Sequence, residues 1–211
     1  MKRETAINMS FQLLLISPPE KRTDEVSTLL QLFDAGLGLF HLRKPTWSEV
    51  EVDEYLGTIP ERFHPRIVLH NHYGLARRYA LRGLHLPAHS RPTWQPQLRQ
   101  PGQSLSTSFH RLAEIRAHRR HYNYVLLSPI FDSISKAGYS SAFPLPAVQQ
   151  LLRQGQRRPH YVPQVIALGG ITAATVGIAQ EAGFAGAAVL GAVWQATDPV
   201  AAFQAIHSKI G

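Results

Sequence analysis

The chain has 211 residues, 44% hydrophobic and 17% charged, which allows one sizeable core and argues against intrinsic disorder. It has no cysteine, which excludes disulfides and thiolate chemistry and leads us to expect a cytoplasmic protein. No apolar run reaches the ~18 residues of a spanning helix, and the N-terminus lacks an apolar signal core. We therefore expect neither a membrane partner nor a secretory signal.

The net charge of +8 raises the question of a nucleic-acid partner. The basic residues are dispersed along the chain, in pairs such as Arg77–Arg78 and Arg157–Arg158, and no RNA-binding motif accompanies them. We interpret them as a solvated basic surface that would also attract phosphorylated substrates. A nucleic-acid binder stays a minor alternative.

Short apolar runs alternate with helix-compatible segments along the chain. The predicted strands are Phe11–Ile16, Leu37–Leu42, Arg66–His70, Gly83–Leu86, Gln103–Thr107, Tyr124–Leu127, Pro163–Ala167 and Ala185–Val189. The predicted helices are Thr23–Asp34, Trp47–Thr58, Leu75–Ala80, Arg111–Arg119, Leu145–Gln154, Thr172–Glu181 and Pro199–Lys209. Residues 87–102 contain four prolines and leave room for only a short helix.

Two helix starts have capping signals. Asp198 before Pro199 is a favourable pair for the first positions of the last helix. Thr46 followed by Glu49 resembles a capping box.

Repeated alternation of strand and helix predicts a parallel sheet, and eight such units in this length favour a closed (β/α)8 TIM barrel. No linker or change in composition divides residues 1–211, so we expect a single domain. In such barrels the functional residues follow the carboxyl ends of the strands.

Three segments at those ends predict a phosphate site. Gly169 and Gly170 follow the seventh strand and precede a predicted helix, and Gly191 and Ala192 follow the eighth. The loop Ser128–Lys136 follows the sixth strand and offers hydroxyls and a lysine to an anion.

Basic residues follow other strands. Arg43 can bind a phosphate bidentately, and strand alternation places it on the same face as His41. His110 can move a proton near neutral pH. His70 and His85 are interpreted as hydrogen-bonded core or rim residues, because the pattern is only a weak signal for zinc.

Four of these motifs, in this order and spacing, resemble the thiamin phosphate synthase and thiazole tautomerase family. They are HLRK at 41–44, Ser-Phe-His at 108–110, SPIFDSISK at 128–136 and ALGGI at 167–171. The resemblance extends from Leu37 to Val193 and implies a (β/α)8 barrel, a homodimer, and a phosphorylated thiazole or thiamin phosphate as the small-molecule partner.

The resemblance assigns roles by position. His110, Lys136 and Arg43 take catalytic roles in proton transfer or in holding a leaving pyrophosphate. The implied phosphate- and substrate-binding residues are His41, Asn71, Ser108, Ser133, Ser135, Gly169, Gly170, Gly191 and Ala192.

Two departures from the family pattern affect the expected chemistry. His72 and His89 stand where synthases carry the aspartates that bind magnesium, and imidazole is a poor magnesium ligand. We therefore expect no metal or cofactor, and a tautomerase that moves a proton on a thiazole carboxylate phosphate through His110. The alternatives are a synthase that releases pyrophosphate, either with magnesium or as a metal-poor enzyme, and a non-catalytic binder of thiamin-pathway phosphates.

Overall fold

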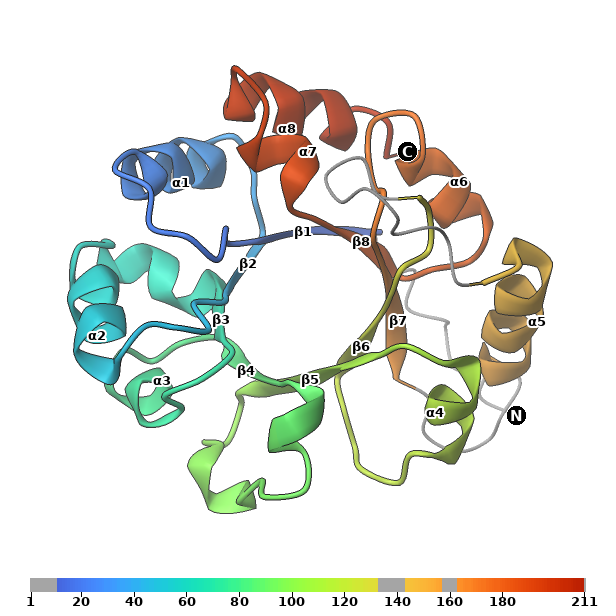
Figure 1. Ribbon diagram of the computed structural model, residues 1–211, viewed down its shortest axis with the longest axis horizontal. Coiled ribbons are helices and arrows are strands. Elements are labelled where there is room, and N and C mark those ends of the chain that lie inside the picture. The colour runs from blue at the N-terminus through green and yellow to red at the C-terminus, as the bar shows by residue number, and fades with distance from the viewer. Residues whose placement is uncertain (1–10, 133–142, 157–162, 211) are drawn as a thin grey trace, which may run out of the picture.

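The protein folds as a closed barrel of parallel strands, as predicted. The structure, a computed structural model, describes residues 11–132, 143–156 and 163–210. The strands pair in the order of the chain, and β1 pairs with β8 to close the ring (Figure 1). They are β1 (Gln12–Ile16), β2 (Leu39–Leu42), β3 (Ile67–Leu69), β4 (Gly83–Leu86), β5 (Ser104–Phe109), β6 (Tyr124–Leu127), β7 (Gln164–Leu168) and β8 (Gly186–Val189).

The helices lie outside the ring of strands (Figure 1). They are α1 (Glu25–Asp34), α2 (Glu49–Gly57), α3 (Gly74–Arg78), α4 (Leu112–Ala117), α5 (Leu145–Gln156), α6 (Val176–Glu181), α7 (Gly191–Trp194) and α8 (Pro199–His207). The described residues also form three 3-10 helices, η1 (Glu61–Arg66), η2 (Ala88–Ser90) and η3 (Pro96–Leu98). None of the described helices is long and apolar enough to cross a membrane.

The strands separate two apolar clusters because successive side chains point to opposite faces. Leu13, Leu15, Phe40 and Leu42 belong to the larger cluster, which also contains buried residues of the helices. Leu14, Ile16, Tyr124, Leu126, Ile166 and Ala188 form the smaller cluster, with the opposite strand parity. The smaller cluster therefore fills part of the barrel interior.

Polar side chains also face the barrel interior. His41 and His85 have interior parity on β2 and β4, and His70 follows the end of β3. Ser104 and Ser106 are buried on β5. The buried residues of the smaller cluster thus come from β1, β6, β7 and β8. The polar half of the interior, on or directly after β2 to β5, holds these histidines and serines beside the apolar Val68 of β3.

The structure differs from the prediction at the start of α2 and agrees with it at two other places. The capping box of α2 is Ser48 with Glu51, not Thr46 with Glu49, so the helix begins two residues later than predicted. The Asp198 cap is confirmed, since its carboxylate accepts a hydrogen bond from the amide of Ala201 at 2.9 Å. Residues 87–102 form only η2 and η3, which confirms the expected interruption.

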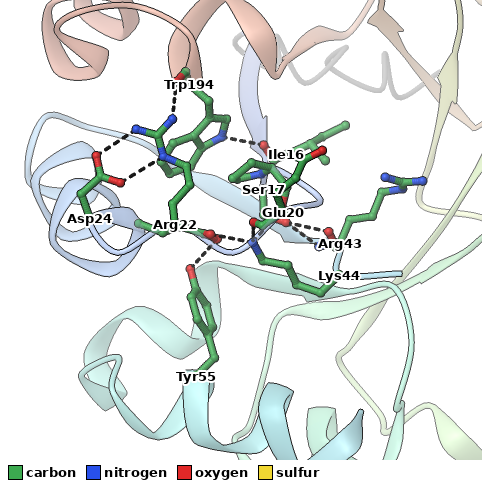
Figure 2. Close-up of polar contacts among 11 residues, drawn as sticks. Ile16, Ser17, Glu20, Arg22, Asp24, Arg43, Lys44, Tyr55 and Trp194 are labelled. Carbon is green, nitrogen blue, oxygen red and sulfur yellow. Dashed lines mark hydrogen bonds and ion pairs between the residues drawn. The ribbon is translucent and has the colours of Figure 1, made fainter. Parts of the chain in front are cut away.

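Side chains reinforce the seam between the first and last units of the barrel. The indole Nε1 of Trp194 donates to the carbonyl of Ile16 at 2.8 Å. The guanidinium of Arg22 donates to the carbonyl of Trp194 at 2.7 Å and pairs with Asp24 at 2.9 Å (Figure 2). The two hydrogen bonds made by Trp194 join segments more than 170 residues apart.

Candidate active site

Arg43 emerges at the carboxyl end of β2 and is exposed. Its backbone is fixed to the end of β1 through Ser17, whose hydroxyl accepts from the Arg43 amide at 2.8 Å and donates to the Arg43 carbonyl at 3.0 Å. The side chain extends away from the neighbouring Lys44 (Figure 2). The predicted anion-binding arginine therefore combines a fixed backbone with an exposed guanidinium.

Lys44 is fully buried on the opposite side of the backbone. Its ammonium pairs with Glu25 at 2.6 Å and donates to the carbonyls of Pro18 at 2.7 Å and Glu20 at 2.9 Å (Figure 2). Tyr55 donates to the other carboxylate oxygen at 3.0 Å. Burial raises the pKa of Glu25 and lowers the pKa of Lys44, so the pair forms against a desolvation cost. Lys44 is a structural cation that ties α1 and α2 to the end of β2.

Three buried histidines meet in the polar half of the interior. Nδ1 of His41 lies 2.9 Å from Nε2 of His70, and Nε2 of His41 lies 2.7 Å from the hydroxyl of Tyr124. The rings of His70 and His85 are stacked with centroids 4.1 Å apart. His85 is held between the hydroxyls of Ser106 at 2.9 Å and Ser108 at 3.0 Å. We call His41, His70 and His85 the histidine cluster.

The histidine cluster is held in its neutral form. Burial lowers the pKa of His41 to about 3. Burial, followed by His85, His41 and the Arg43 charge, lowers the pKa of His70. Burial, followed by His41 and the charges of Arg43 and Arg91, lowers the pKa of His85. His41 is fully buried below the mouth, whereas the sequence predicts it among the substrate-binding residues. The interpretation of His70 and His85 as hydrogen-bonded buried residues fits this geometry.

The positions that would hold magnesium present imidazoles. His72 adopts a φ of 48°, and its Nε2 lies 2.8 Å from the carbonyl of Trp47. His89 is exposed in η2 after β4. Asn71 donates to the carbonyl of Lys44 at 3.0 Å, while its Oδ1 is buried without a hydrogen-bond partner in the described part of the chain. One amide oxygen beside two imidazoles does not fit a magnesium ion, which requires several hard oxygen ligands.

His110 follows β5 and is exposed. Its Nδ1 lies 3.1 Å from the carbonyl of Ser128 and 3.3 Å from the hydroxyl of the same residue. Because a carbonyl only accepts, Nδ1 carries the proton in that bond and the lone pair of the neutral ring lies on Nε2. His110 is therefore oriented as a proton acceptor at the rim.

The loop after β7 passes close to the loop after β6. Gly169 and Gly170 have φ values of 97° and 64°, and a Cβ on Gly170 would lie 2.5 Å from the carbonyl oxygen of Asp132. The prediction that a helix starts at Thr172 is wrong, because α6 begins at Val176. Thr175 accepts from the amide of Thr172 at 2.9 Å and donates to the carbonyl of Gly170 at 2.8 Å, which holds the segment as a turn.

The structure brings together only part of the predicted site. It joins Ser108 to the histidine cluster, and it places Gly191 and Ala192 at the start of α7. Ser133, Ser135 and Lys136, predicted to contact the phosphate or pyrophosphate, lie outside the described residues.

Four residues in these networks fall outside the set predicted from the sequence: Glu25, Tyr55, Ser106 and Tyr124. Strand parity could have identified two of them, because Ser106 and Tyr124 share the interior parity of Ser108 and Leu126. Glu25 carries no such signal, since an acidic residue in the first turn of a helix is ordinarily a surface residue.

A surface hollow of about 450 Å³ lies elsewhere. Its lining includes Pro65, Leu81, Arg82 and Gln103, which precede β3, β4 and β5. It therefore opens at the amino ends of the strands, opposite to the end where barrel enzymes carry their chemistry.

Sequence comparison relates the chain to known enzymes. The family model described as thiamine monophosphate synthase matches residues 13–193. The thiamine-phosphate synthase of Cronobacter sakazakii is 27% identical over 180 residues, covering 83% of each chain. That of Bacillus velezensis is 22% identical over 217 residues, covering 100% of this chain and 95% of the relative.

Solved structures agree with this relationship. A thiamine phosphate pyrophosphorylase from Bacteroides thetaiotaomicron superposes with a TM-score of 0.79 and 27% identity, covering 94% of this chain and 97% of the other. A thiamine phosphate pyrophosphorylase from Pyrococcus furiosus, at 18% identity, shares the fold with a TM-score of 0.74 and 95% coverage of both chains.

Proposed function

Because the chain belongs to the thiamine monophosphate synthase family, we propose that it is a transferase that joins an aminopyrimidine diphosphate to a phosphorylated thiazole and releases pyrophosphate. The observation that carries the proposal is the family match over residues 13–193. The relatives reported above are named synthases, so they support the transferase better than the tautomerase expected from the sequence.

In this proposal, charge on the leaving pyrophosphate is offset by the protein. Arg43 is exposed at the mouth, and the Ser17 bridge fixes its backbone. A guanidinium can donate two parallel hydrogen bonds to a diphosphate and stabilise charge that develops as the bond breaks. Lys136 would add a second cation, and Gly169, Gly170, Gly191 and Ala192 would hold the thiazole phosphate. His72 and His89 do not fit magnesium, so no step is assigned to it.

Loss of the Arg43 guanidinium should reduce transfer strongly. We expect Arg43→Met to lower kcat/KM for thiamin phosphate formation by about 100-fold, because an electrostatic contact to the developing charge is removed. Arg116→Met, an exposed arginine on α4, is the matched control and should leave the rate unchanged. Equal rates for the two variants would contradict the role of Arg43.

Three histidines near the carboxyl ends of the strands favour a second function. His110 has its lone pair on Nε2, and the two positions expected to hold magnesium carry His72 and His89. This combination suits proton transfer on a thiazole carboxylate phosphate, in which Nε2 accepts the proton from one ring position and returns it at another.

One purified sample can separate these functions. It is given the aminopyrimidine diphosphate and thiazole phosphate with magnesium, the same pair with a chelator, and the thiazole carboxylate phosphate alone. Thiamin phosphate in both of the first two mixtures supports the proposal. Aromatisation in the third mixture alone would replace it with the tautomerase. Tight binding of thiamin phosphate without either reaction would leave a non-catalytic binder.

The remaining expectations concern partners. We expect a homodimer, which light scattering of the eluted protein would test. A dispersed basic surface gives us no reason to expect nucleic-acid binding, and a gel shift at low salt would contradict that expectation.

A further inference from the structure

The histidine cluster has the composition of a metal site that the family chemistry does not require. We propose that His41, His70 and His85 bind one divalent transition-metal ion of the Zn²⁺ or Co²⁺ class inside the barrel. One ring nitrogen from each histidine can be chosen so that all three lie within 4.8 Å of one another, and all three residues are buried. Three imidazoles with a fourth position for water or substrate is the ligand set of a catalytic zinc site.

The separations between the ring nitrogens are close to those around a bound zinc ion. Two nitrogens at about 2.1 Å from one tetrahedral zinc lie about 3.4 Å apart. Nδ1 of His41 and Nε2 of His70 lie 2.9 Å apart, and metal binding would increase this separation slightly. The most distant pair of ligand nitrogens would have to approach by up to about 1.4 Å to reach that ideal spacing. Rotation of the rings can supply this movement. The metal would replace the proton now shared between His41 and His70.

Neighbouring hydroxyls would orient the ligands. With Nδ1 of His41 on the metal, its Nε2–H donates to the hydroxyl oxygen of Tyr124, which lies 2.7 Å away. With Nε2 of His85 on the metal, its Nδ1–H donates to Ser106 at 2.9 Å. A hydrogen bond to the second ring nitrogen is the usual partner of a metal-bound histidine, because it fixes the tautomer and the ring orientation.

The environment selects the class of metal. The imidazoles are neutral, which is the form that binds metal, and nitrogen ligands favour zinc, cobalt, nickel or copper over magnesium. The positive charge of Arg43 acts on His70 and His85 and opposes a dication. An anion in the fourth position would offset that repulsion.

The fourth position is reached from the side of Ser108. Its hydroxyl lies 3.0 Å from Nε2 of His85, and the residue is partly exposed, unlike the three histidines. A water or a substrate oxygen that enters from the mouth beside Ser108 would complete the coordination. Arg43, at the same end of the barrel, could contact such an anion.

Titration with Co²⁺ measures metal binding to the histidine cluster directly. Tag-free protein is stripped with a chelator, desalted and titrated with Co²⁺ while visible absorption is recorded, and the metal content of freshly isolated protein is measured in parallel. We expect one equivalent to bind with the strong absorption bands of tetrahedral Co²⁺. Zn²⁺ should then displace the colour and raise Tm by about 5 °C at a hundredfold excess over its Kd. Magnesium should do neither.

Variants locate the binding. His41→Gln and His70→Asn should each weaken Co²⁺ binding by at least about 100-fold, because even the loss of an outer partner costs 10–100-fold. Circular dichroism of the metal-free variants checks that they fold, and either folded variant suffices. The double variant His72→Gln/His89→Gln removes two rim imidazoles and should bind like the parent protein. Absence of stoichiometric binding, or binding lost only in the double variant, would overturn the proposal.

Discussion

Arg43 and Lys44 are adjacent cations with opposite environments. Arg43 is exposed at the mouth, whereas Lys44 is buried against Glu25, two carbonyls and the ring of Trp47, whose centroid lies 4.7 Å from its ammonium. Strand parity predicts that they point apart, but it does not predict that the second would be enclosed. Trp47 comes from the segment after β2, but the polar partners come from the loop after β1 and from α1, so only the assembled barrel creates this pocket.

Loss of the Lys44 charge should destabilise the protein. We expect Lys44→Met to lower the free energy of unfolding by about 3 kcal/mol, because Glu25 is left buried without its counter-ion. Adding Glu25→Gln should recover part of the loss by removing the unpaired charge. Urea denaturation provides the measurement.

An exposed ion pair is the control for Lys44. Arg78→Met breaks the surface pair with Asp53 and should cost less than about 1 kcal/mol. A loss for Lys44→Met as small as that for Arg78→Met would mean that the buried pair contributes no more than a surface pair.

The orientation of His110 leads to a prediction for the tautomerase alternative. We expect His110→Ala to reduce aromatisation of the thiazole carboxylate phosphate by about 100-fold or more, because the positioned base is lost. Binding of thiazole phosphate, measured by calorimetry, should persist because the glycine loops are unchanged. His207→Ala, on the exposed end of α8, serves as the control. Full turnover in His110→Ala would remove this residue from the mechanism.

The loop between β7 and α6 depends on the backbone freedom and small size of Gly170. We expect Gly170→Ala to destabilise the protein by about 3 kcal/mol, because a methyl group would overlap Asp132 and Phe131 at a positive φ. Gly36→Ala also introduces a side chain at positive φ, but into open space, and should cost about 1 kcal/mol. Equal losses in thermal melts would mean that the close approach between the loops carries no cost.

The sequence predicts strands better than helix starts. β4 and β6 have the predicted bounds because glycine or polar residues flank short apolar runs. α6 starts four residues later than predicted because the side chain of Thr175 bonds the backbone at Gly170 and Thr172. Apolar periodicity is a property of many residues, whereas a single hydroxyl can shift a helix start, so the latter is harder to predict.

At the scale of the whole molecule, the polar half of the barrel interior makes stability depend on pH. The three cluster histidines have pKa values lowered by burial, with Arg43 and Arg91 adding positive charge nearby. Unfolded histidines titrate near 6.5, so below that pH the unfolded chain binds more protons than the folded one. Stability is therefore retained above about pH 6.5 and is lost as the pH falls toward the folded pKa values.

This dependence can be measured on the metal-free protein. We expect the free energy of unfolding in chelator to fall by up to about 1.4 kcal/mol per pH unit for each cluster histidine below pH 6.5. His41→Gln should reduce the slope between pH 6 and 5 by one such increment. An unchanged slope in that variant would show that His41 does not contribute to the pH dependence.

The sequence predicts the barrel but not the histidine cluster. Alternation of strand and helix over the chain is enough to identify a closed ring. His41 and His85 lie on β2 and β4 and His70 directly follows β3, so their ring contacts depend on the stagger between neighbouring strands. That stagger is a property of the closed barrel, so sequence spacing alone gives the face of each histidine and not its neighbours.

Trp194, at the seam between β1 and β8, allows closure of the barrel to be followed by fluorescence. Long-range strand pairing is slow because distant segments must meet, and this seam joins the two ends of the barrel. Trp194 is buried there and bonds to Ile16. Of the other two tryptophans, Trp47 packs against Lys44 and Tyr55, and Trp94 packs against Tyr73. In a Trp47→Phe/Trp94→Phe background, fluorescence would follow ring closure alone. Its refolding phase should lag behind the recovery of helical circular dichroism.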